Sequence, residues 1–129
     1  MAQENKITIL STFANDQLVS ENGTIIRKQN GGPAFYLNRA LKNEKVFFAM
    51  KTGQKMKVQI LMTKDGEFGK VPKKPTQRAI RFSQIKTPFL LISSVLNEFD
   101  LANLSIFKGK VFLDIQGYVR NGNDFGKKN

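Results

Sequence analysis

The chain has 129 residues, 40% of them hydrophobic and eleven of them phenylalanine, a composition that suits one compact domain and excludes intrinsic disorder. It contains no cysteine and no histidine, which excludes disulfides, thiol catalysis, imidazole base chemistry and the common zinc sites. The formal net charge of +11 suits a polyanionic partner, a sugar phosphate or a nucleotide, and it equally suits a solvated basic surface.

The first predicted elements are a buried strand and a hairpin. The apolar run at residues 6–10 is typical of a short buried strand. Asn22-Gly23 is the strongest short signal for a two-residue hairpin turn, and it predicts a hairpin over residues 17–28.

A glycine pair followed by proline predicts the start of a helix. Gly31 and Gly32 have no Cβ, so the backbone can turn tightly and a ligand can approach it closely. Pro33 suits the first helical turn, and apolar residues at spacings of three and four continue the helix to about Asn43. Amide groups at a helix start of this kind can receive an anion or a polar ligand.

The middle of the chain predicts a second buried strand and a second hairpin. The strand is expected at residues 45–50, which are rich in valine and phenylalanine. Asp65-Gly66 predicts a hairpin over residues 58–71, and a loop rich in proline and lysine follows at residues 72–77.

The last third predicts three strands and a short helix. The strands are expected at residues 79–82, 88–93 and 110–114, and the last two are apolar runs typical of buried strands. The helix between them is expected to begin at Ser94 or at Asp100, since either side chain can cap it.

Strands that alternate with helices predict a layered α/β fold with a mostly parallel sheet. The hairpins are additions that such a sheet does not need, so we expect them to form a small lid or an interface sheet. The domain is expected to span residues 1–120, with hairpin lid elements at about 17–28 and 58–71. Residues 121–129 are polar and are expected to form a flexible tail.

Asn15 and Asp16 follow the first predicted strand. Polar residues just beyond strand carboxyl ends tend to face the ligand crevice of an α/β sheet, where a carboxylate accepts hydrogen bonds from sugar hydroxyls. A turn-forming Asn-Asp pair is the alternative, and position alone favours it.

A second polar group follows the last predicted strand. Asp114 ends that strand, and Gln116 and Arg120 come soon after it, so the three side chains are candidates for one polar cluster. Arg120 would then pair with a carboxylate or phosphate. In the alternative, Asp114 caps the strand end and Arg120 is solvated. Asp65 and Glu67 are explained by their hairpin turn, and we predict no catalytic residue and no metal site.

The densest basic region, residues 64–81, contains two prolines and is predicted to be a loop between strands. It makes a nucleic-acid partner an alternative, although the aromatic residues fall in apolar runs and not on a stacking platform. A structural or oligomerisation module is a further alternative. We expect no membrane span and no signal peptide, and the absence of cysteine is compatible with a cytoplasmic location.

Taken in order, several of these pieces resemble the N-terminal half of the ribokinase-like carbohydrate kinase family. The resembling segments are residues 12–16, the hairpin turn at 22–23, and residues 31–36, 46–53 and 113–120. The segment at 113–120 looks like an Asp-x-Gln-Gly-x-x-Arg stretch of some sugar or inositol kinases.

The resemblance implies a fold that phosphorylates an alcohol group of a sugar, cyclitol or nucleoside with ATP and magnesium. It implies that Asp16, with Asn15 beside it, binds substrate hydroxyls and that Gly31 and Gly32 lie against the substrate. It also implies that a small lid sheet closes over the sugar and often mediates dimers.

Two positions depart from the family pattern: Tyr36 stands where many members have asparagine, and Gln54 where aspartate is usual. Family members are more than twice as long, and no residue here matches their glycine-rich anion hole or catalytic base. The sequence therefore predicts a substrate-side part that binds no ATP and has no kinase activity by itself. We expect it to associate with a missing C-terminal half or with another copy.

Overall fold

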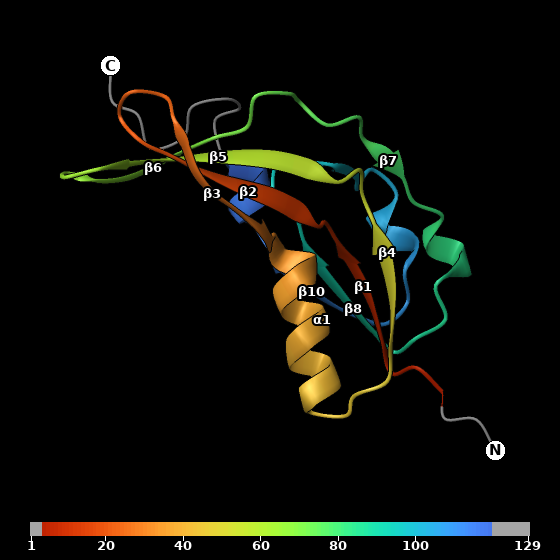
Figure 1. Ribbon diagram of the computed structural model, residues 1–129. Helices are drawn as coiled ribbons and strands as arrows, with labels where there is room; N and C mark the ends of the chain where they lie inside the picture. The colour runs from red at the N-terminus through yellow and green to blue at the C-terminus, as the bar shows by residue number, and fades with distance from the viewer. Residues whose placement is uncertain (1–3, 120–129) are drawn as a thin grey trace.

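A parallel sheet of four strands lies at the centre of the computed structural model, which describes residues 4–119 (Figure 1). The order across the sheet is β10-β8-β1-β4, and each neighbouring pair is parallel. The strands are β1 (Ile7–Ser11), β4 (Phe48–Thr52), β8 (Phe89–Ser93) and β10 (Lys110–Asp114). The predicted α/β fold with a mostly parallel sheet is confirmed.

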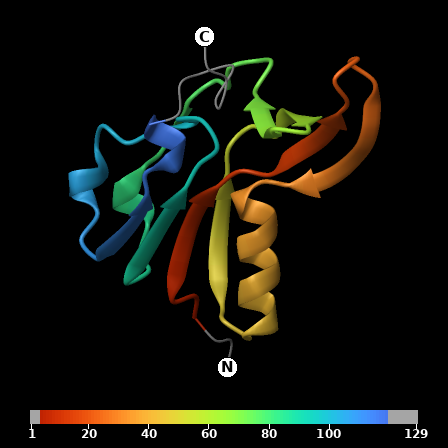
Figure 2. The same cartoon turned by 90° about the vertical axis from the view of Figure 1, so that its left-hand side faces the viewer.

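A second sheet of four strands grows from the carboxyl ends of β1 and β4, and we call it the lid sheet (Figure 2). The chain passes directly from β1 into β2, and the amide of Met56 donates to the carbonyl of Phe13 at 3.1 Å, which joins the two hairpins. Both predicted hairpins are therefore present, and they share one sheet in the order β3-β2-β5-β6. The strands are β2 (Ala14–Val19), β3 (Ile25–Gly31), β5 (Met56–Thr63) and β6 (Gly66–Lys70).

Helix α1 (Pro33–Asn43) lies on one side of the parallel sheet, and several short elements lie on the other side (Figure 1). The main hydrophobic core fills that second side. Its buried members from the sheet and the short elements include Leu10, Leu90, Ile92, Phe82, Phe99 and Phe107. The short elements on that side are β7 (Arg78–Ala79), β9 (Phe99–Asp100) and two 3₁₀ turns (Phe82–Gln84 and Leu104–Ile106). Helix α2 (Gln116–Val119) follows β10 at the carboxyl end of the sheet. No helix within residues 4–119 is long and apolar enough to cross a bilayer.

The helix predicted from the glycine pair is confirmed at Pro33–Asn43, but the strand after it starts later than predicted. Lys45 adopts a left-handed conformation with φ of 56°, and the amide of Val46 donates to the carbonyl of Leu41 at 2.9 Å. The chain is therefore still leaving the helix at these residues, and β4 begins only at Phe48.

Two further local predictions are wrong. Asn15 and Asp16 lie inside β2 and not in a turn, because the chain continues from the parallel sheet into the lid sheet without reversing. The helix expected after Ser94 or Asp100 is only a 3₁₀ turn, and the Asp100 carboxylate accepts the Ala102 amide at 3.0 Å from within β9.

Strand β10 is present as predicted but is not buried. Val111, Phe112 and Leu113 are 38%, 53% and 42% exposed. Within residues 4–119, β10 pairs only with β8, so it is an edge of the sheet. An apolar run indicates a strand suited to burial, but it does not show whether neighbouring elements cover that strand.

Candidate functional site

A cleft of about 440 Å³ lies between the lid sheet and the carboxyl ends of β8 and β10. Figures 1 and 2 show how these two sheets are arranged. Its lining comes from β2, the start of α1, the β5–β6 hairpin, and the turns that follow β8 and β10. The carboxyl ends of parallel strands are the usual ligand-binding edge of α/β sheets. The folded chain therefore brings together polar groups that are about a hundred residues apart in sequence.

Asp16 lines the cleft from the middle of β2. Across the hairpin, Gly31 lies on the same face, and a Cβ at this glycine would collide with the Asp16 carboxylate. Gly31 thus leaves room for the carboxylate. Burial raises the pKa of Asp16 above its ordinary value, because a partly desolvated carboxyl loses hydration of its charged form. Within residues 4–119, no protein group donates a hydrogen bond to this carboxylate, so its oxygens can accept from a ligand.

Gly32 lines the cleft where β3 passes into α1. Its φ is 85°, and a Cβ would lie 2.6 Å from the Thr12 carbonyl oxygen and 2.7 Å from the Ala14 nitrogen. The Ala34 amide donates to that same Thr12 carbonyl at 3.1 Å, and the Phe35 amide donates to the Gly32 carbonyl at 3.2 Å. Two amides at the helix start are therefore bonded inside the protein, which argues against an open anion cradle at this segment.

Asp114 and Gln116 line the same cleft as Asp16. Ser93 donates its hydroxyl proton to Asp114 Oδ2 at 3.1 Å, and the Gln116 amide donates to Asp114 Oδ1 at 3.1 Å. Asp114 thus accepts two hydrogen bonds at the turn after β10 and also forms part of the cleft wall. The predicted cluster with Arg120 stays a prediction.

Several other lining residues were missed by the sequence reasoning, among them Tyr36, Val58, Ile60, Glu67 and Ser94. Val58 and Ile60 alternate along β5, and this period of two could have placed them on one face. Glu67 had been explained by its hairpin turn alone. Ser94 is 3% exposed, and its Oγ has no hydrogen-bond partner within the described part of the chain.

Two predicted site residues are not brought to this cleft. Asn15 pairs with Asn30 in the lid sheet, and strand alternation turns its side chain away from the face that carries Asp16. Gly31 supports Asp16 but does not itself line the cleft. Arg120 and the predicted tail at residues 121–129 lie outside the described residues.

The charge of the cleft contrasts with that of the whole chain. Asp16, Glu67 and Asp114 line it, and the described lining includes no lysine or arginine. Within residues 4–119, no three histidine, cysteine, aspartate or glutamate side chains gather into a group that could hold a metal ion.

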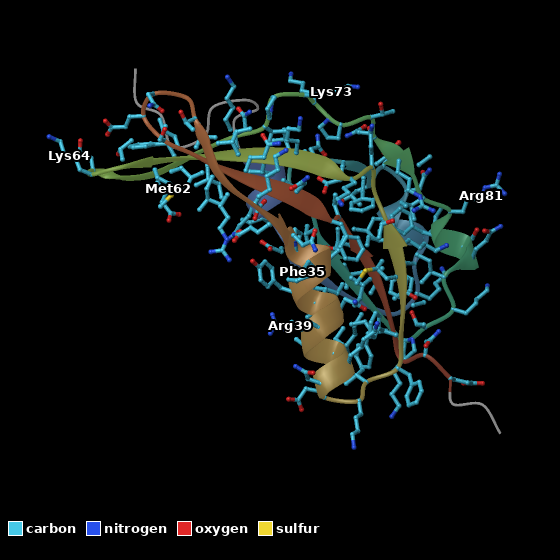
Figure 3. All side chains as sticks on the ribbon, in the orientation of Figure 1. Phe35, Arg39, Met62, Lys64, Lys73 and Arg81 are labelled. Atoms are coloured by element: carbon cyan, nitrogen blue, oxygen red, sulfur yellow. The ribbon has the colours of Figure 1, made fainter. Side chains whose placement is uncertain are left out.

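The basic loop borders a different and smaller hollow of about 230 Å³, which is lined in part by Lys73 and Lys74. Figure 3 shows Lys64, Lys73 and Arg81 spread widely over the outer surface. These three residues do not gather, although Lys55, Lys57, Lys73 and Lys74 together line the smaller hollow. A nucleic-acid interface stays a prediction.

Two solved structures share this fold, and both are pyrophosphate-dependent kinases in the ribokinase family. One, a sulfate complex, aligns with a TM-score of 0.55 and 11% identity over 88% of this chain and 51% of its own. The other, complexed with a pyrophosphate analog and myo-inositol, aligns with a TM-score of 0.53 and 11% identity over 88% of this chain and 50% of its own. No family model matches the sequence, and no curated protein matches it either.

The chain is thus an α/β protein with the fold found in about half of a ribokinase-family kinase. It spans about half the length of these two structures. The resemblance predicted from short motifs is supported at the level of the fold.

Proposed function

We propose that this chain is the substrate-binding part of a ribokinase-type carbohydrate kinase, and that its cleft binds a neutral polyol such as a sugar or a cyclitol. The observation that carries the proposal is the placement of Asp16 in a cleft that the lid sheet closes on one side. One structural neighbour is described as a complex with myo-inositol, which is a ligand of this chemical class.

The Asp16 carboxylate is suited to bind hydroxyl groups. It is partly desolvated, and no described protein group donates to it, so a polyol hydroxyl would supply the missing hydrogen bond. Hydrogen bonds to an ionised acceptor are stronger than neutral ones, by roughly twofold. Ser94 Oγ is buried at the same cleft and has no hydrogen-bond partner among residues 4–119, so it is a second candidate contact.

The remaining lining favours a neutral ligand. Glu67 and Asp114 add acidic groups, which would repel a phosphorylated or carboxylated sugar. Val58 and Ile60 present apolar surface from the lid sheet, which can cover the C–H groups of a sugar or cyclitol ring and exclude water.

Phosphoryl transfer depends on a positioned base and on groups that stabilise the phosphate. The described residues do not gather carboxylates into a group fit for a metal ion, and the amides at the α1 start are bonded inside the protein. We therefore assign no ATP or magnesium contact to residues 4–119 and propose that this part alone is inactive. The phosphate donor and the base would come from polypeptide outside this part.

Isothermal titration with myo-inositol and with ribose tests the proposal. Asp16→Asn should weaken binding of the preferred polyol by roughly tenfold to a hundredfold, since a hydrogen bond to a charged group contributes about 1.5–3 kcal/mol. Asn15→Ala, on the opposite face of the same strand, is the matched control and should leave affinity unchanged. Absence of polyol binding, or equal affinity in Asp16→Asn and wild type, would reject the proposal.

A further inference from the structure

The turn between β8 and β9, residues 94–98, forms one wall of the ligand cleft. Ser94 and Val95 from this turn line the cleft, together with Ser93 at the end of β8. Within the turn, Asn97 adopts a left-handed conformation with φ of 50°. The turn belongs to no helix or sheet, so its shape depends on hydrogen bonds of another kind.

The carboxylate of Glu98 holds this turn from inside the protein. One oxygen accepts the Val95 amide at 2.8 Å, the other accepts the Leu96 amide at 2.7 Å, and Glu98 is fully buried. Successive amides in a turn form a small concavity that binds anions. Here the protein's own carboxylate fills that concavity, so the backbone at the cleft wall is fixed by two bonds to one side chain.

Glu98 is in turn fixed at the junction of the two sheets. Its backbone carbonyl accepts the Arg78 amide at 2.8 Å. A Cβ at Gly53 would lie 3.0 Å from Glu98 Cγ and 2.9 Å from Thr12 Oγ1, so these groups pack tightly around the glycine. Thr12 follows β1 and Gly53 follows β4, where the chain leaves the parallel sheet for the lid sheet. Glu98 therefore connects the cleft turn to the part of the fold that carries Asp16.

A buried carboxylate is a costly way to hold a turn. Within residues 4–119, no lysine or arginine forms an ion pair with Glu98. Burial of a carboxylate without a cation costs free energy even when its oxygens accept hydrogen bonds, so stability alone favours a neutral side chain. A group of this kind is explained by the single backbone arrangement that it specifies.

That arrangement decides where Ser94 lies. Ser94 is 3% exposed, and its Oγ has no hydrogen-bond partner within the described residues. A Cβ at Gly117 would collide with Ser94 Oγ and would lie 2.6 Å from the Ser94 carbonyl oxygen, so α2 packs directly on this residue. A shift of the turn would therefore move Ser94 and also the start of α2, where Gln116 lines the cleft.

We propose that Glu98 is a positioning residue for the ligand cleft. Glu98 does not itself line the cleft, and it acts by holding Ser94 and Val95 where a bound polyol contacts them. The proposal rests on the proposed function for the identity of the ligand. It adds a residue that controls affinity from behind the cleft wall.

Calorimetric titration with myo-inositol and ribose tests this role. Glu98→Gln should weaken binding of the preferred polyol at least tenfold, because the glutamine NH₂ group faces one of the two amides and displaces the turn. Phe82→Leu is the control, since Phe82 is buried in the main core and does not line the cleft. It should destabilise the protein and leave affinity unchanged. Equal affinity in Glu98→Gln and wild type, with binding still weakened in Asp16→Asn, would overturn the inference and leave the proposed function standing.

Thiol labelling tests the positioning without any ligand, because the natural chain has no cysteine. Ser94→Cys places one buried thiol in the turn, and its rate of reaction with a thiol reagent reports how often the turn opens. Adding Glu98→Gln should raise that rate at least tenfold, and adding Phe82→Leu should raise it much less. If Ser94→Cys does not fold, Val95→Cys reports on the same turn. Equal rates in the two double variants would show that Glu98 contributes only general stability, and this would overturn the proposal whether or not a polyol binds.

Discussion

Replacing Gly32 with alanine should destabilise the protein far more than the same change at Gly23. Both glycines have positive φ, 85° and 87°. At Gly32 the ψ of 159° completes a conformation that is nearly restricted to glycine, and another residue there costs about 1–3 kcal/mol. The new Cβ would also lie 2.6 Å from the Thr12 carbonyl oxygen and 2.7 Å from the Ala14 nitrogen. Both are backbone atoms at the junction of the two sheets, so neither can move aside as a side chain can.

The expected loss at Gly32 combines this strain with the overlap. Overpacking adds about 1–3 kcal/mol, so Gly32→Ala should lower the free energy of unfolding by about 2–6 kcal/mol. At Gly23 no atom lies within 4 Å of an added Cβ, so only the cost of positive φ remains, about 1 kcal/mol. Urea unfolding followed by circular dichroism measures both variants. Equal losses at the two positions would refute the argument, because the overlap at the sheet junction would then contribute nothing.

Three further changes separate stability from binding. Asp16→Asn should stabilise the ligand-free protein at pH 7, because burial raises the pKa of Asp16 and so penalises its ionised form. In urea unfolding, this gain in stability should shrink as the pH falls through the raised folded-state pKa, and it should vanish below the ordinary value of 3.8. A gain that stays constant with pH would contradict the prediction. Gly31→Ala should weaken polyol binding in calorimetry with little loss of stability, because the new Cβ displaces only the flexible Asp16 side chain; a large loss of stability would count against this. Glu98→Gln should lower the free energy of unfolding in urea by about 1–3 kcal/mol. The fully buried Glu98 carboxylate accepts hydrogen bonds from the Val95 and Leu96 amides at 2.8 and 2.7 Å, whereas glutamine keeps only one acceptor oxygen. An unchanged unfolding midpoint would show that these bonds contribute little.

Local chemistry was enough to predict the hairpins and the long helix. Asn22-Gly23 and Asp65-Gly66 specify tight turns whatever surrounds them, since the residue that needs positive φ is glycine in each turn. Pro33 marks the helix start for a similarly local reason, and α1 runs from that residue to Asn43 as predicted. Alternation of these elements with apolar strands was also sufficient to predict the α/β class.

The tertiary structure alone decided how the site is assembled. Asp16 and Asp114 line one cleft because the parallel order β10-β8-β1-β4 brings strand carboxyl ends to one edge, and strand order depends on contacts between distant segments. The same holds for burial. The apolar run of β10 indicated a buried strand, but burial depends on the neighbours that a strand acquires, and Phe112 has none beyond β8 in the described part of the fold. Turn chemistry acts over a few residues and is legible in sequence, whereas proximity and burial arise only when the whole sheet forms.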